Sequence, residues 1–259
     1  MKKYELTDDS ITFMGRKLFR IRAIRSFNDV AAGDLGGYIE KEENLSHDDD
    51  AWISGDARIF DDARIFDDAH IYGNSCICGN AYIYGNARIG GNARICGNAR
   101  IYGNARIYDN ARIYGNAHIY DHVNISGNAR IYGNAYIYGN SCICGNAYVF
   151  DDAQIYDDAC VGNNAIVSGN AKVYNYACVC GFAIVSGNAK VYDNARVSDN
   201  ARVFDNALIC GDAWIYDYAC VCRNVRVFGK LRINMYDRVY QNTQVSEIAE
   251  KQDYYGRKK

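Results

Sequence analysis

Aliphatic side chains recur at every sixth position of this chain from Ile53 to Val245, and no residue is inserted anywhere in that run. All 33 of these positions hold Ile or Val. Ala stands two residues before most of them, as at Ala57 and Ala63, while Gly or Asp and then Asn or Asp follow two and three residues after them. The repeating unit is therefore A-x-[IV]-x-[GD]-[ND].

Each unit predicts one short β-strand and one bend. In the alternation of a strand, Ala and Ile or Val point to one side and the two variable positions to the other. Gly and Asn tolerate a positive φ and are expected to form the bend. A helix is excluded because a period of six scatters the aliphatic residues around its circumference. Three four-residue strands with three bends make a triangular 18-residue turn, so the pattern predicts an all-β parallel solenoid of about 11 turns.

The two ends of the chain depart from the repeat. Residues 11–25 predict a β-hairpin around Met14-Gly15-Arg16, and residues 1–50 are expected to form a cap over the first turn. Residues 51–246 form the predicted β-helix, which degrades in its last two turns, where Leu231, Asp237 and Thr243 replace the small residue. Residues 247–259 are expected to form a tail, either as a short helix or frayed.

The hexad pattern resembles the hexapeptide repeat of left-handed parallel β-helices over about residues 51–246. That resemblance, and not the periodicity, implies a left-handed coil, because parallel crossovers are usually right-handed. A second resemblance lies upstream. The segment FNDVAAGDLGGYIEKEENLS at 27–46 is similar to the segment that precedes the helix in uncharacterised bacterial and phage proteins of the YdcK type. This second family implies no activity.

Composition places further bounds on the function. The formal net charge of −2 favours no polyanionic partner, and the absence of Pro suits a chain made almost entirely of ladder strands. The amino terminus MKKYELTDDS lacks an apolar signal run, and no segment approaches the ~20 apolar residues of a membrane span. We expect a cytoplasmic protein without membrane contact, and its eleven cysteines should be mostly free thiols.

Outward positions 18 residues apart should stack in columns, and one column is aromatic. It comprises Phe66, Tyr84, Tyr102, Tyr120, Tyr138, Tyr156, Tyr174 and Tyr192. The column beside it includes Arg64, Arg100, Lys172 and Lys190. A stripe of this extent is comparable to surfaces that mark interaction sites, so we predict a homodimer or homotrimer formed through this face. The alternatives are a glycan or nucleic acid bound along the tyrosines, and mere stabilisation of neighbouring strands.

Cysteine also falls in columns. Cys142, Cys160 and Cys178 occupy successive turns, with Cys144 and Cys180 beside them. Thiolates at such spacing could hold a soft metal. Cysteine is also a small residue that suits a strand surface, however, and no His lies in that patch. We therefore expect neither a metal nor a cofactor, and these five cysteines are the alternative ligand set.

An enzymatic alternative comes from the resemblance, because many hexapeptide-repeat proteins are acyltransferases that use acetyl-CoA. Such enzymes typically extrude a loop from one coil and place a His at a subunit interface as general base. No loop is extruded from this repeat, and His118 fills a slot that usually holds Arg. The leading prediction is a non-enzymatic scaffold or interaction module without catalytic residues, and the alternative is an acyltransferase with His118 as base.

Overall fold

The computed structural model of the chain describes residues 1–234, 237–240 and 244–245. Secondary structure within these residues is β-strand, apart from one 3-10 helix. The chain divides into two compact units, Met1–Asn128 and Ala129–Lys259, called unit 1 and unit 2 below. The predicted tail at 247–259 lies outside the described residues.

Each hexad contributes one strand, and the strands pair in parallel with those 18 residues away. In unit 1, for example, Arg100 pairs with His118 and Ile101 with Ile119. From β4 to β36 the strands come three to a turn, which makes a β-solenoid of about 11 turns and confirms the predicted fold class. Each strand holds two ladder residues instead of the four expected. The left-handed sense of coiling stays an expectation.

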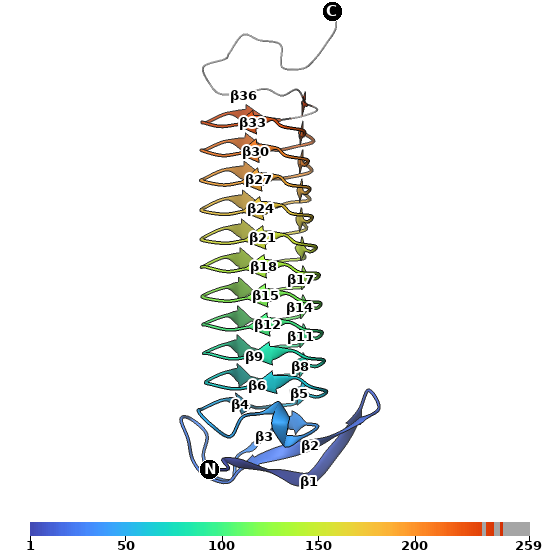
Figure 1. Cartoon of the computed structure of the whole chain (residues 1–259), viewed down its shortest axis with the longest axis vertical. Helices are drawn as coiled ribbons and strands as arrows, with labels where there is room; N and C mark the ends of the chain where they lie inside the picture. The colour runs from blue at the N-terminus through green and yellow to red at the C-terminus, as the bar shows by residue number, and fades with distance from the viewer. Residues whose placement is uncertain (235–236, 241–243, 246–259) are drawn as a thin grey trace, which may run out of the picture. The chain divides into compact units, whose positions relative to one another are not determined.

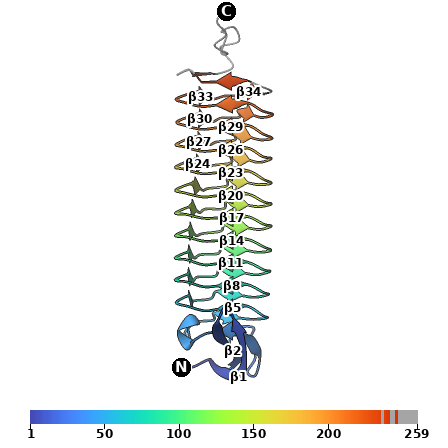
Figure 2. The same ribbon diagram turned by 90° about the vertical axis from the view of Figure 1, so that its right-hand side faces the viewer.

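Unit 1 contains three parallel ladders, two of which are visible as vertical stacks in Figures 1 and 2. The first ladder comprises β4 (Trp52–Ile53), β7 (His70–Ile71), β10 (Arg88–Ile89), β13 (Arg106–Ile107) and β16 (Asn124–Ile125). The second comprises β5 (Arg58–Ile59), β8 (Cys76–Ile77), β11 (Arg94–Ile95) and β14 (Arg112–Ile113). The third comprises β6 (Arg64–Ile65), β9 (Tyr82–Ile83), β12 (Arg100–Ile101) and β15 (His118–Ile119).

Unit 2 repeats this arrangement. Its first ladder comprises β19 (Cys142–Ile143), β22 (Cys160–Val161), β25 (Cys178–Val179), β28 (Arg196–Val197), β31 (Trp214–Ile215) and β34 (Arg232–Ile233). The second comprises β17 (Arg130–Ile131), β20 (Tyr148–Val149), β23 (Ile166–Val167), β26 (Ile184–Val185), β29 (Arg202–Val203), β32 (Cys220–Val221) and β35 (Arg238–Val239). The third comprises β18 (Tyr136–Ile137), β21 (Gln154–Ile155), β24 (Lys172–Val173), β27 (Lys190–Val191), β30 (Leu208–Ile209), β33 (Arg226–Val227) and β36 (Gln244–Val245).

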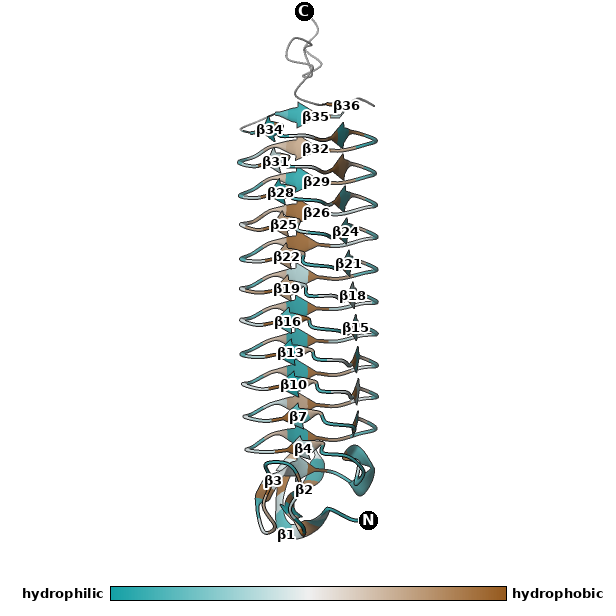
Figure 3. Cartoon of the chain, turned by 90° about the vertical axis from the view of Figure 1, so that its left-hand side faces the viewer, coloured by the Kyte–Doolittle hydropathy of each residue, from teal (hydrophilic) through white to brown (hydrophobic). Residues whose placement is uncertain are grey.

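The core of each unit is the predicted set of Ala and aliphatic residues. Ala105 and Ile107 in unit 1, like Ala171 and Val173 in unit 2, have no exposed surface. Burial of each Ile or Val contributes about 1.5–3 kcal/mol against chain entropy. The outward position of each strand varies freely, so that in Figure 3 β26 is brown and apolar while β29 is teal and polar. Specific chemistry therefore lies on the outer surface.

The corners depend on the Gly or Asp of each hexad. Gly97 has a φ of 83° and Asp109 a φ of 60°, and within the described residues the Asn slot that follows shows no such value. Asn takes such a φ where it fills the Gly or Asp slot itself, as at Asn163 with a φ of 56°, so the prediction that Asn bends the chain is confirmed only there. In the slot that follows, the Asn side chain links successive turns, as where Asn98 Nδ2 donates to Asn116 Oδ1 at 2.8 Å. A corner Asp adds a second link, since Asp109 Oδ2 accepts from the Gly127 N–H at 2.9 Å.

The N-terminal cap is larger than the sequence predicts. The hairpin pairs β1 (Tyr4–Phe13) with β2 (Arg16–Ala23) around Met14 and Gly15, as expected, but it begins seven residues upstream of the predicted start. An unpredicted strand, β3 (Leu35–Ile39), pairs antiparallel with β2 and parallel with β5. The cap thus occupies the starting edge of the second ladder.

The 3-10 helix η1 (Glu42–Asn44) fastens the cap to that turn. Asn44 is fully buried, and its Nδ2 donates to the carbonyl of Ala63 at 2.8 Å. Its Oδ1 accepts from the N–H of Lys41 at 3.0 Å. No helix in the described part of the chain is long and apolar enough to cross a membrane.

Candidate functional site

The aromatic column forms two stacks of four rings, one in each unit. Phe66, Tyr84, Tyr102 and Tyr120 in unit 1 have successive ring centroids 4.9–5.0 Å apart and nearly parallel planes. Tyr138, Tyr156, Tyr174 and Tyr192 in unit 2 have centroids 4.8–4.9 Å apart. We call these eight rings the aromatic face. The ring spacing equals the strand spacing of a sheet, so the ladder itself sets the stack.

Stacking decides which part of each ring is available to a partner. Every ring of the aromatic face is half-buried, and inside each stack both ring faces are covered by neighbouring rings. Burial raises the pKa of Tyr156 to about 12, so this hydroxyl stays protonated at neutral pH. The inner tyrosines of each stack therefore offer a partner their ring edges and hydroxyl groups. A sugar or base could not stack on the covered faces.

Opposite charges flank the aromatic face. The predicted basic column lies on one side, where Arg64, Arg100 and Lys190 are exposed and Lys172 is half-buried. Corner carboxylates lie on the other side, directly after the rings in sequence. These are Asp67, Asp68, Asp121, Asp157, Asp158 and Asp193. The sequence prediction noted the basic side and missed the acidic one, although the [GD]-[ND] slots already contained it.

His118 lies in the basic column of unit 1, in register with Arg100. It is half-buried, and burial, followed by the charge of Arg100, lowers the pKa of its imidazole. A lowered pKa favours the neutral imidazole that a general base requires, but it does not distinguish the acyltransferase alternative from a substitution in an Arg slot. That alternative stays a prediction.

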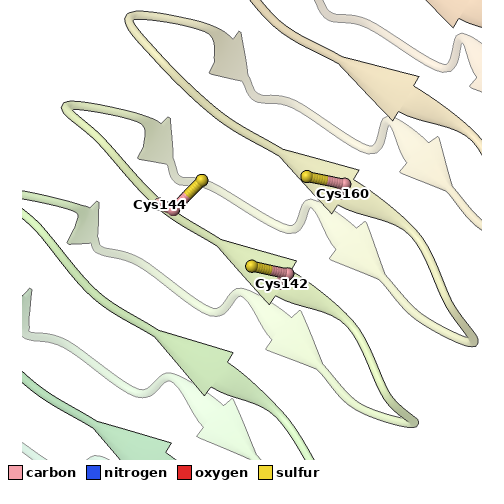
Figure 4. Close-up of side chains that lie close together, drawn as sticks. All are labelled: Cys142, Cys144 and Cys160. Atoms are coloured by element: carbon pink, nitrogen blue, oxygen red, sulfur yellow. The ribbon is translucent and has the colours of Figure 1, made fainter.

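Three predicted thiols of unit 2 form a compact group. Cys142 lies on β19 and Cys160 on β22 in register with it, while Cys144 follows β19 (Figure 4). Their three Sγ atoms all lie within 4.8 Å of one another. We call these three residues the thiol triad. Hydrogen bonding with Cys142 and then with Cys178 raises the pKa of the Cys160 thiol.

Two further predicted thiols continue this column. Cys178 on β25 pairs in register with Cys160, and Arg196 pairs with Cys178 on the following strand. Hydrogen bonds from Cys160 and then Cys180 lower the pKa of the Cys178 thiol, against its burial. Five cysteines are thus contiguous on one face of unit 2.

A disulfide joins Cys78 to Cys96 in unit 1, and the other nine cysteines are free. The prediction of mostly free thiols holds, but this bridge was not predicted. Its two residues share one slot 18 positions apart, yet Cys142 and Cys160 have the same spacing and stay free. Sequence spacing alone therefore cannot identify the bridge.

Native thiol titration should separate these classes of cysteine. We expect the eight half-buried free thiols to react with a small thiol reagent in the native protein, more slowly at Cys160 because its pKa is raised, and the buried Cys76 to react only on denaturation. Cys78 and Cys96 should appear only after reduction. Titration of the metal-free protein under argon, before and after guanidinium and reductant, measures this. Fast reaction of Cys76, or eleven thiols without reductant, would contradict the assignment.

Parts of the repeat are similar to a known family. The family described as YdcK beta solenoid repeat matches residues 93–106, 105–121, 153–169, 189–205 and 195–211. A search of curated proteins finds no match. The chain is also similar to a crystal structure of a Francisella novicida UDP-N-acetylglucosamine acyltransferase, with 23% identity and a TM-score of 0.30. That match covers 66% of this chain and 64% of the other, and at this TM-score it carries no argument about activity.

Proposed function

We propose that this protein is a scaffold whose copies associate through the aromatic face, since segments of both units match the YdcK beta solenoid repeat. The observation that carries the proposal is the pair of regular ring stacks with unlike charges on their two sides. The packed core leaves the outer surface to hold any partner.

The ring edges of tyrosine suit a surface that is exposed to water in the monomer and buried against a partner in the assembly. The ring buries apolar area in a contact, and the hydroxyl bonds to water or to a partner group. Aromatic residues are enriched in protein interfaces for this reason. The glycan and nucleic-acid alternative is less well supported, because stacking ligands need the ring faces that the neighbouring rings cover.

The charge arrangement favours a second copy of the same chain. A two-fold axis parallel to a ring column places the basic side of one copy opposite the acidic side of the other. In unit 2 this sets Lys172 and Lys190 against carboxylates such as Asp158 and Asp193. Such complementarity steers encounter and fixes orientation more than it adds affinity. The ring edges then supply the central contact.

Charge inserted into the aromatic face tests the proposal. Tyr102→Glu with Tyr138→Glu should reduce the particle mass of the assembled protein to that of one chain, because two carboxylates would be buried in the contact. Folding should persist, since each lost ring stack contributes only about 0.5–1.5 kcal/mol. Light scattering gives the mass and circular dichroism the fold.

A matched control lies on the second ladder. Tyr114 follows β14 in unit 1 and Tyr132 follows β17 in unit 2, and both are half-buried like the residues tested. Tyr114→Glu with Tyr132→Glu should leave the assembly intact. A wild-type protein that is monomeric at all concentrations would overturn self-association. Equal dissociation of both variants would show that the aromatic face is not the contact.

A further inference from the structure

We infer that the thiol triad Cys142, Cys144 and Cys160 is a binding site for one soft divalent cation of the zinc class. This site is independent of the proposed self-association, because it lies on the first ladder of unit 2 and the aromatic face follows the third. The inference rests on how the backbone gathers three sulfurs at one point.

Two features bring the sulfurs together. The parallel register of β19 and β22 places Cys142 and Cys160 side by side, so their side chains leave the sheet in the same direction (Figure 4). Cys144 leaves the same face two residues later, over the position of Gly162 on the next turn. A Cβ at Gly162 would lie 3.1 Å from Cys144 Sγ. Glycine there leaves the room that the third sulfur occupies.

The distances fit a thiolate site after a small adjustment. Zn–S bonds of about 2.3 Å in a tetrahedron hold sulfurs about 3.8 Å apart. The three Sγ atoms lie within 4.8 Å of one another, so a change of about 1 Å in their separations, on the scale of a side-chain rotation, would reach that geometry. All three residues are half-buried, which leaves a fourth coordination position on the solvent side.

Charge and ligand type select the class of ion. Three thiols release their protons to solvent when they bind a metal, and the three resulting thiolates need a cation. The in-register neighbour of Cys160 on the following strand is Cys178, which supplies no positive charge. Thiolates favour soft or borderline ions over magnesium or calcium. A divalent ion of the zinc class meets both conditions.

Other cysteine groups of the chain lack this arrangement and serve as internal controls. Cys220 and Cys222 have the same C-x-C spacing, but Cys220 lies between Arg202 and Arg238 in its ladder. Cys76 lies beside the Cys78–Cys96 disulfide, which leaves one free thiol in that group. Within the described residues, only the thiol triad brings three free sulfurs within 4.8 Å of one another.

The experiment uses the full chain, purified anaerobically with its disulfide intact and stripped of metal by a chelator. Titration with Co²⁺ should give thiolate-to-cobalt absorption that saturates at one ion per chain, and Zn²⁺ should displace it. Cys144→Ser should weaken Zn²⁺ affinity on the order of tenfold or more, by analogy with the loss of supporting groups in metal sites. Ser198 occupies the same column in the native chain, so serine is compatible with the fold.

Cys220→Ser with Cys222→Ser is the matched control and should bind Co²⁺ and Zn²⁺ as the wild type does. Saturating Zn²⁺ should also raise the melting temperature of the wild type and the control more than that of Cys144→Ser. Absence of one-to-one binding overturns the site. Unchanged affinity in Cys144→Ser, or lost binding in the control, also overturns it. A Cys142–Cys160 disulfide in the anaerobic protein would do the same.

Discussion

Ile107→Asp is expected to abolish folding of unit 1, or to reduce its free energy of unfolding by more than about 4 kcal/mol. Ile107 is fully buried on β13, and its neighbours along the ladder are Ile89 and Ile125. The substitution removes apolar packing and places a carboxylate where no cation can reach it. Urea denaturation followed by circular dichroism measures the loss.

The control for this prediction is the adjacent residue. Arg106→Asp introduces the same carboxylate at the exposed position of the same strand. It should change the unfolding free energy by less than about 0.5 kcal/mol. Equal denaturation midpoints for the two variants would show that the repeat tolerates charge in its interior and would contradict the packing described above.

Gly37→Val should detach the cap from the first turn. A Cβ at Gly37 would lie 2.5 Å from Ile53 Cγ2 and 2.7 Å from the carbonyl oxygen of Ala57. That carbonyl accepts the Tyr38 N–H at 2.8 Å, so the added side chain forces β3 away from its hydrogen-bond partner. Overpacking of this kind costs about 1–3 kcal/mol, and here it is opposed by backbone that cannot move.

The consequence of that detachment is an open ladder edge. Freed edges of β-sheets pair with other chains, so Gly37→Val should form large particles that grow with time and concentration. Light scattering follows the growth, and hydrogen exchange should show faster exchange at Tyr38. Leu35→Val is the control, because Leu35 is 56% exposed and keeps its Cβ. A stable, non-aggregating Gly37→Val protein would mean that β3 does not protect the edge.

The features of the fold that follow from the six-residue period could be predicted from the sequence. The buried positions from Ile53 onward, the in-register columns and the hairpin turn at Met14 follow from alternation and turn chemistry, and the structure confirms them. It did not predict β3, because LGGYI has no repeat and becomes a strand only by pairing with β2 and β5. Its two glycines were the available signal, since they permit close backbone approach.

The candidate sites, too, could be predicted from the sequence only in part. Spacing predicted that Tyr102 lies above Tyr84, but the parallel rings depend on side-chain rotamers that no pattern specifies. Spacing likewise predicted the alignment of Cys142 with Cys160. The approach of Cys144 depends on the space left by Gly162, a residue whose side chain is absent. The space that a glycine leaves for a neighbouring side chain is difficult to infer from the sequence.

The ring stacks also bear on how such a uniform chain finds its correct pairing. A slip of six residues between neighbouring turns keeps Ala over Ala and Ile or Val over its like, so the buried core does not oppose the error. The outer columns do oppose it, because a slipped Tyr102 would lie against Gly90 or Cys78 in place of Tyr84 and lose that ring partner. Each lost stack costs about 0.5–1.5 kcal/mol. The aromatic face thus makes a chain folded in a slipped register less stable than one in the native register. The buried core cannot make this distinction, because its residues are of the same kind in every hexad.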